Sequence, residues 1–270
     1  MFRSSLRTFA QSLMVLACIH TAAAQAPPVP PVDPTVADRL KELKGLVADS
    51  KMAGDMQAVS LMQALTKEPG KLNPKDKERI VKGLGDVFHH GKVRTADKDI
   101  LYREASDALA KLGPEAGQEL AKAIGSVRFK DAIPLQAHFL LATGRTQDDK
   151  QVQLLVDTAA RSNHDELRAA AGEALGNYTS LEMKARREVV KTLVRTWGSL
   201  HQQATTPDPT DPNQPIPIQP QNARQTLRAV EGKWGATLTR LTGVSNTAFM
   251  DWQRWLNKNP NWVGPETKKP

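Results

Sequence analysis

The chain has 270 residues, and its 37 lysine and arginine residues against 29 aspartate and glutamate residues give a formal net charge of +8. This modest excess suits anionic partners but does not indicate binding to nucleic acid. Aromatic residues make up only 5% of the chain, and runs rich in valine, isoleucine and threonine are missing. Alanine, leucine, lysine, glutamate and glutamine dominate, and these residues favour helices. The composition therefore predicts an all-α protein rather than one built on sheets.

The first 24 residues have the three parts of an export signal. Arg3 and Arg7 supply a positive start, residues 9–19 are mostly apolar, and Ala22–Ala24 provides the small residues that export peptidases need. The apolar run is shorter than the ~20 residues that span a bilayer, and no later stretch is long enough either. We expect residues 1–24 to be a signal peptide cleaved after Ala24, which predicts a periplasmic or extracellular protein without a transmembrane segment. Export argues further against a nucleic-acid partner, and loss of the two arginines lowers the net charge from +8 to +6.

The only cysteine, Cys18, leaves a second interpretation of the N-terminus open. Residues 15–18 read Val-Leu-Ala-Cys and loosely resemble the lipobox of bacterial lipoproteins, in which the cysteine becomes a lipid-anchored first residue. That pattern prefers a small residue where this chain has Leu16, so we favour the alanine-rich cleavage site downstream. The mature chain would then lack cysteine, which excludes disulfides, thiol catalysis and zinc sites with cysteine ligands.

Beyond a proline-rich tether at residues 25–34, the hydrophobic periodicity predicts helices that follow one another in pairs. We expect Thr35 to cap the first helix, whose apolar residues lie at helical spacing: Val36, Leu40, Leu43 and Val47. The later helices, bounded mostly by glycine, proline and asparagine, are expected at about residues 54–68, 74–90, 97–112, 115–125, 132–143, 148–161, 165–177, 181–203 and 223–241.

A proline-rich insertion at about residues 204–222 separates the last two of these helices. Residues 205–220 contain six prolines in sixteen positions, which fits neither a helix nor a central strand. We expect an irregular loop over one face of the array. Such loops are sometimes binding elements, although most are solvated spacers, and we interpret this one as a spacer.

Two segments of the chain are close copies of each other. Residues 103–113 read REASDALAKLG and residues 167–177 read LRAAAGEALGN, and residues 136–144 form a weaker copy between them. Aligning Leu109, Leu141 and Leu175 gives spacings of 32 and 34 residues, a period typical of stacked helical hairpins. Small residues allow helices to approach closely, so we expect six residues to be buried between repeats: Ala105, Ala108, Leu109, Ala170, Ala171 and Leu175.

These segments resemble HEAT repeats, an armadillo-type family whose second helix carries an arginine, alanine-rich positions and an Ala-Leu pair. The resemblance covers about residues 35–242. The ending, Leu-Thr-Gly at 241–243 followed by the Trp-x-x-Trp of Trp252 and Trp255, is similar to the end of exported bacterial HEAT-repeat proteins. The resemblance implies a right-handed α-solenoid of about five hairpins at residues 35–243. It also implies a C-terminal capping helix with a tail at residues 244–270, and an interaction role without a named partner.

No motif in the sequence points to catalysis, a cofactor or a metal. The side chains of His89 and His90 would diverge by about 100° on a helix and would not converge on one ion. Asp165 and Glu166 follow Asn163, which we interpret as a helix cap with acidic residues in the first turn. Metal-dependent hydroxylases with HEAT repeats use repeated His-Glu pairs, and this sequence contains none. We therefore expect a protein that is not an enzyme.

One helix carries a row of cations that is our candidate partner-binding site. Lys184, Arg187, Lys191 and Arg195 lie three, four and four residues apart and so share one helix face. Glu188 lies in the same row, where it can pair with Lys184 and Lys191. The row can bind an acidic partner or an anionic polymer, or it can be an ordinary solvated face, and the last of these explains the pattern with fewest assumptions.

All five tryptophans fall in the last third of the chain, and Trp252 and Trp255 share one face of a short helix. They can act as an exposed anchor for a peptide or glycan. Alternatively they can cover the open apolar face at the end of a solenoid, where Trp197 and Trp234 would be the residues covered. We expect capping, with at least one of the pair buried against the final hairpin.

Two functions therefore remain. The first is an exported, non-enzymatic HEAT-repeat scaffold that binds another protein in the bacterial envelope or outside the cell. The alternative is binding of an anionic envelope polymer or glycan through the basic helix face and the proline-rich loop. Neither hypothesis needs a cofactor.

Overall fold

The computed structural model describes residues 29–206 and 218–265. The expected signal peptide with Cys18, the first residues of the tether, the centre of the proline-rich insertion at 207–217 and the tail at 266–270 lie outside the described residues. All regular structure in the described ranges is helical, which confirms the all-α prediction. In these ranges no helix combines the length and the apolar character that crossing a membrane requires.

The described residues form eleven α-helices, joined by loops and short 3₁₀ turns. Their bounds are α1 Thr35–Ala48, α2 Asp55–Leu65, α3 Pro74–Asp86, α4 Ile100–Leu112, α5 Gly117–Ile124, α6 Ile133–Thr146, α7 Val152–Arg161, α8 Asp165–Leu175, α9 Met183–Ala204, α10 Ile218–Thr242 and α11 Phe249–Lys258.

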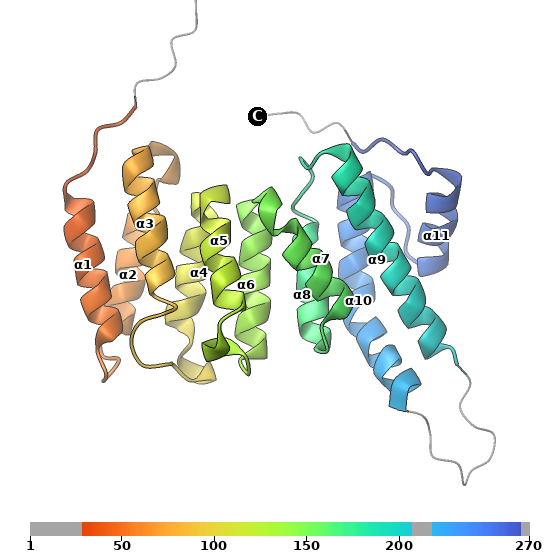
Figure 1. Cartoon of the computed structure of the whole chain (residues 1–270), viewed down its shortest axis with the longest axis horizontal. Helices are drawn as coiled ribbons and strands as arrows, with labels where there is room; N and C mark the ends of the chain where they lie inside the picture. Colours follow the sequence, from red (N-terminus) through yellow and green to blue (C-terminus); the bar gives the residue numbers. More distant parts are fainter. Residues whose placement is uncertain (1–28, 207–217, 266–270) are drawn as a thin grey trace, which may run out of the picture.

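The helices are arranged in two layers, as Figure 1 shows. Each odd-numbered helix from α1 to α9 packs against the even-numbered helix that follows it in the chain. The even-numbered helices α2 to α10 pack against one another in chain order, and α11 packs against α9 at the far end. Five consecutive helix pairs therefore stand side by side, each in contact with its neighbours along the sequence.

The first helix is capped by a residue other than the expected one. Thr35 is the first residue of α1, and the cap comes from Asp33, whose carboxylate accepts hydrogen bonds from the backbone N–H and the hydroxyl of Thr35, both at 2.8 Å. By contrast Asn73 caps α3 ahead of a first-turn proline, because its side chain accepts from the N–H of Lys75 at 2.9 Å. The Asp33 carboxylate thus serves the first N–H of α1, whereas a capping threonine at position 35 would have served N–H groups further into the helix.

The cap of α8 and the start of α10 also differ from the sequence prediction. α8 begins after His164 rather than after Asn163, and the loop is instead closed by the Ser162 hydroxyl, which accepts from the N–H of His164 at 3.2 Å. α10 begins at Ile218, so the insertion is shorter than residues 204–222. Pro220 lies in the first turn of α10, where the N–H that proline lacks would have had no helical partner.

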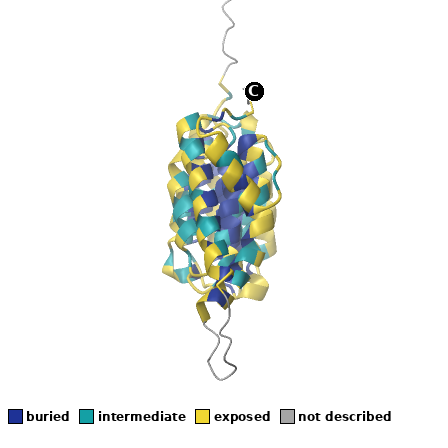
Figure 2. Ribbon diagram, turned by 90° about the vertical axis from the view of Figure 1, so that its right-hand side faces the viewer, coloured by how far each residue is buried: buried dark blue, intermediate teal, exposed yellow. Residues whose placement is uncertain are grey.

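The core lies between the two layers, and Figure 2 shows the buried residues as a central band flanked by more exposed helix faces. All six residues expected at repeat interfaces are buried, with at most 2% of any of them exposed. Leu141, on which the weak copy was aligned, is half-buried, whereas the adjacent Leu140 is fully buried.

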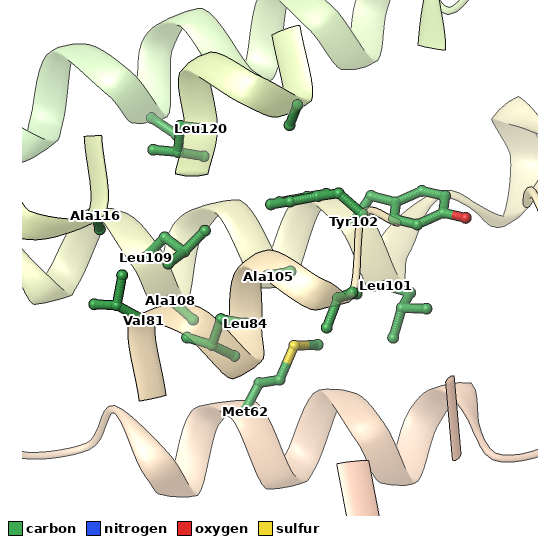
Figure 3. Packing of buried hydrophobic residues seen from close by; sticks show 14 of the residues in the cluster. Met62, Val81, Leu84, Leu101, Tyr102, Ala105, Ala108, Leu109, Ala116 and Leu120 are labelled. Atoms are coloured by element: carbon green, nitrogen blue, oxygen red, sulfur yellow. The ribbon is translucent and has the colours of Figure 1, made fainter. Parts of the chain in front are cut away.

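Two hydrophobic clusters make up this core. The first runs from Val36 of α1 to Ala142 of α6, and Figure 3 shows its centre, where residues from Met62 to Leu120 interlock across successive helices. The second runs from Ala137 of α6 to Trp262 beyond α11. Helix α6 contributes to both, with Phe139 in the first cluster and Leu140 in the second.

The C-terminal helix covers the end of the second cluster. Trp252 is fully buried in the cluster that also contains Trp234, Leu238 and Leu241, which confirms the expected burial of at least one of the paired tryptophans. Trp255 is half-buried, and its ring centroid lies 5.9 Å from that of Trp252. Two further aromatic contacts complete this end, Phe249 against Trp197 and Trp262 against Trp255, and neither was predicted from the sequence.

Ala171 tests the packing between repeats because none of its surface is exposed. We expect Ala171→Leu to overpack this interface and lower the free energy of unfolding by about 1–3 kcal/mol. Ala236→Leu on the exposed face of α10 is the matched control and should change it by less than about 0.5 kcal/mol. Thermal and denaturant unfolding measure both values, and equal melting temperatures for the two variants would contradict the assigned face.

Removal of the capping helix is a second test. Truncation after Gly243 takes away Trp252, whose burial alone is worth about 3–5 kcal/mol, and exposes the apolar end of the second cluster. We expect the shortened protein to melt at a lower temperature and to aggregate, as followed by scanning calorimetry and light scattering. A truncated chain that stays monomeric and melts like the full-length protein would instead mark these tryptophans as a binding anchor.

Candidate functional site

The basic face of α9 contains the four residues predicted to bind a partner, and the structure gives two of them partners within the chain. Arg187 donates from Nε and Nη2 to the carbonyl of Trp262, at 2.9 and 2.8 Å, and so holds the C-terminal segment. Lys191 pairs with Glu188 at 3.0 Å, as the spacing suggested. Lys184 and Arg195 are exposed, with no ion-pair partner among the described residues. The four side chains therefore do not form one uncommitted row of cations.

A different surface has a more distinct shape. An elongated groove of about 410 Å³ runs between α1 and α3, the first helices of the first two pairs. Its floor is apolar: Leu40 of α1 and Gly83 of α3 are half-buried there, and Leu43 and Val47 of α1 with Val87, just after α3, have at most 2% of their surface exposed. Concave, mostly apolar surfaces of this size are the usual form of binding sites in proteins.

The rim of the groove is cationic on both sides. Lys41 and Lys44 lie along the edge formed by α1, and Arg79 and Lys82 along the edge formed by α3. Asp86 is the one carboxylate among the lining residues, and Arg79 is 3.6 Å from Asp76 at the start of α3. Across the described residues, the three lysines have no ion-pair partner. On each helix the two cations lie three residues apart and so share one edge, and the apolar lining residues lie between the two edges.

Close approach of the helices sets the depth of the groove. Gly83 lies under the side chain of Leu40, and a Cβ at position 83 would be 2.6 Å from Leu40 Cδ2. A larger residue there would push α1 away from α3 or force Leu40 into the groove. The missing side chain therefore lets the two helices meet while the groove stays open beside them.

Hydrogen bonds fix the N-terminal end of the groove. The buried carboxylate of Asp76 accepts from the backbone N–H of Asp33 at 2.7 Å, and the side chain of Asn73 donates to the carbonyl of Pro30 at 2.6 Å. Asn73 immediately precedes α3, and Asp76 lies in its first turn. The chain that enters α1 is thus attached to the start of α3, which aligns the beginnings of the two helices.

Arg94 fixes the other end. Its buried guanidinium donates to the carbonyl of Val47 at 3.1 Å and to the two carboxylate oxygens of Asp55 at 2.7 and 3.1 Å. The hydrogen bond to Asp55 raises the pKa of Arg94, in spite of its burial. Beside it Gly91 has a φ of 71° and lies so close that a Cβ would collide with the Val47 carbonyl. The loop after α3 therefore holds the end of α1 and the start of α2 together.

The described residues offer little that resembles reaction chemistry. They contain no group of three or more histidine, cysteine, aspartate or glutamate side chains placed to hold a metal ion. The ring of His90 lies at the end of the groove, where Nδ1 is 2.9 Å from the carbonyl of Asp86. Asp107 of α4 contacts His138 and Arg145 of α6; burial raises its pKa, but these two partners outweigh burial and lower it. We interpret that cluster as a link between two helices.

The groove has no signature within either helix sequence. Lys41, Lys44, Arg79 and Lys82 resemble solvated faces of two separate amphipathic helices when each helix is considered alone. The signal lies in the pairing of Leu40 with Gly83 across about forty residues, and that pairing becomes visible only when α1 and α3 are placed side by side. In comparisons with known proteins, no family model, no curated protein and no solved structure matches this chain.

Arg94→Ala should show how far the groove depends on this guanidinium. The substitution leaves the carboxylate of Asp55 and the carbonyl of Val47 without their donor, so we expect the free energy of unfolding to fall by about 2–4 kcal/mol. Arg103→Ala removes a more exposed arginine paired with Asp99 and should cost about 1 kcal/mol or less. Urea unfolding measures both, and an Arg94 variant no less stable than the Arg103 variant would show that the contact is dispensable.

Proposed function

We propose that the protein is an exported, non-enzymatic scaffold that binds another protein in the bacterial envelope or outside the cell. In this proposal the five helix pairs form a right-handed α-solenoid of HEAT-like repeats, and α11 is its cap. The N-terminal export signal supports the location, and the repeat of arginine, alanine and leucine supports the family.

The observation that carries the interaction role is the groove between α1 and α3. The groove is open to solvent, and hydrogen bonds hold both of its ends. At one end Asp33, just before α1, bonds to Asp76 of α3, and at the other Arg94, in the loop after α3, bonds to Val47 of α1. A surface that is already formed pays little ordering cost when a partner binds. Stacked helix pairs are well suited to this task because they present long, shaped surfaces rather than a closed reaction cleft.

The alternative, an anionic envelope polymer bound through α9 and the proline-rich insertion, has less support. Arg187 holds the C-terminal segment and Lys191 has a neighbouring carboxylate, so fewer cations on this face are unpaired than the sequence suggested. A polymer bound at α9 would also leave the groove between α1 and α3 unoccupied.

Affinity capture at two salt concentrations tests the function. The chain from Gln25 onward, immobilised and exposed to envelope extract, should retain a protein at both about 50 mM and about 500 mM salt, because a packed interface is little affected by screening. Polymer binding through several lysines and arginines should be lost at the higher concentration. Mass spectrometry and carbohydrate analysis of the eluate identify which class is retained. Retention of polymer alone, released by salt, would overturn the proposal.

A further inference from the structure

The groove between α1 and α3 also indicates what kind of segment occupies it. We infer that it binds an acidic amphipathic helix of a partner protein, about three turns long, with a leucine-like stripe on the floor and carboxylates facing both rims. This inference rests on the proposed interaction role and names the chemistry of the partner.

Length and shape favour a helix. The lining residues of α1 run from Ala37 to Val47, which at 1.5 Å per residue is a distance of about 15 Å, or about three helical turns. The accessible apolar lining on α1 is Ala37 and Leu40, three positions apart, and Leu43 and Val47 continue the same helical period as buried residues at the base. A helix whose own apolar residues follow the same period can pack along this floor, the common arrangement of helix-in-groove recognition.

The charges on the rims indicate which charge the bound segment carries. The lining contains four cations, Lys41 and Lys44 on one rim with Arg79 and Lys82 on the other, against the single carboxylate of Asp86. Carboxylates on both flanks of a docked helix would each find a cation, while a basic helix would meet like charge on both sides. The described ends of this chain do not supply such an acidic helix, since the proline-rich residues 29–34 carry one carboxylate, which already bonds to Thr35, and residues 259–265 carry none.

The apolar floor distinguishes a peptide from a purely polar anion. A polysaccharide or nucleic acid would satisfy the cations but would leave the floor uncovered, whereas an amphipathic helix buries the floor and pairs the rims together. An anionic lipid surface would share both features, and a second copy of this chain would share them if it offered an acidic helix. Both are distinguished in the experiment.

The probe is a synthetic, fluorescently labelled helix of about twelve residues. It carries leucines at positions i, i+3, i+4 and i+7 and glutamates on both flanks. One control peptide has the same composition with the leucines distributed around the helix, and another has lysine in place of every glutamate. We expect the purified full-length protein to bind the first peptide in fluorescence anisotropy and to bind each control at least about tenfold more weakly.

Variants of the protein locate the site. Ala37 is exposed in the first turn of α1, where an added carboxylate is favourable for the helix, so Ala37→Glu should fold normally while placing a negative charge in the groove. We expect Ala37→Glu, and the pair Lys41→Glu with Lys82→Glu, each to weaken peptide binding about tenfold. Ala37→Gln should weaken it much less. Lys111→Glu with Lys150→Glu, a charge-matched pair on exposed positions elsewhere, should retain the wild-type affinity.

The opposite results overturn the inference. Equal loss in the Lys111 and Lys150 pair would mean unspecific attraction, and equal affinity for the shuffled peptide would mean that the floor is not used. Phosphatidylglycerol vesicles that bind in place of the peptide and are lost in Ala37→Glu would replace the helix with a lipid surface. Concentration-dependent dimerisation in sedimentation, abolished by the same variant, would replace it with a second copy. If affinity capture retains the same partner with wild type and Ala37→Glu, the scaffold function stands and the groove is not its site.

Discussion

Arginine side chains that bond to carbonyl groups at helix ends hold this structure together. The last carbonyls of a helix have no partner within it, and cations are favourable there because of the helix dipole. Arg94, between α3 and α4 of the second pair, donates to the end of α1 in the first pair. Arg128, between α5 and α6 of the third pair, donates to the carbonyls that follow α3 in the second pair. Arg168 and Arg224 serve the ends of α7 and α9 within their own pairs. Where such a contact crosses between pairs it fixes their spacing, and the groove depends on the first of these crossings.

Packing positions were predictable from the sequence because they repeat. The alanines and leucines around Leu109 and Leu175 recur with the helical period and at the period of a helix pair, and all of them are buried. The third copy is weaker, because bulky residues such as Phe139 and Leu140 fill its buried positions where the other two copies have several alanines. Helix ends were less predictable, since Asp33 and Ser162 act through backbone geometry that several nearby polar residues can provide equally well.

The candidate site was the least predictable part. An arginine that bonds to a backbone carbonyl leaves no mark on the residue that accepts, so Arg94 and Val47 share no pattern in the sequence. Arg187 is a similar case: its place in a row of cations suggests a binding face, but its guanidinium donates to the carbonyl of Trp262. A charged side chain on a helix surface has an uncertain purpose until its neighbours across the layer are known. Shape, rather than residue type, distinguishes the cations around the groove from those of α9.

The seam at α6 has a consequence for how the molecule responds to stress. Phe139 and Leu140 are adjacent in the chain, yet they belong to separate hydrophobic clusters, so this one helix is where two cores meet. In an array of this kind, unfolding spreads through nearest-neighbour contacts, and α6 packs against α4 on one side and α8 on the other. An event that loosens the tryptophan-rich cluster is therefore expected to reach the N-terminal cluster chiefly through this fourteen-residue helix, with Ile124 of α5 as a second residue that packs against both clusters.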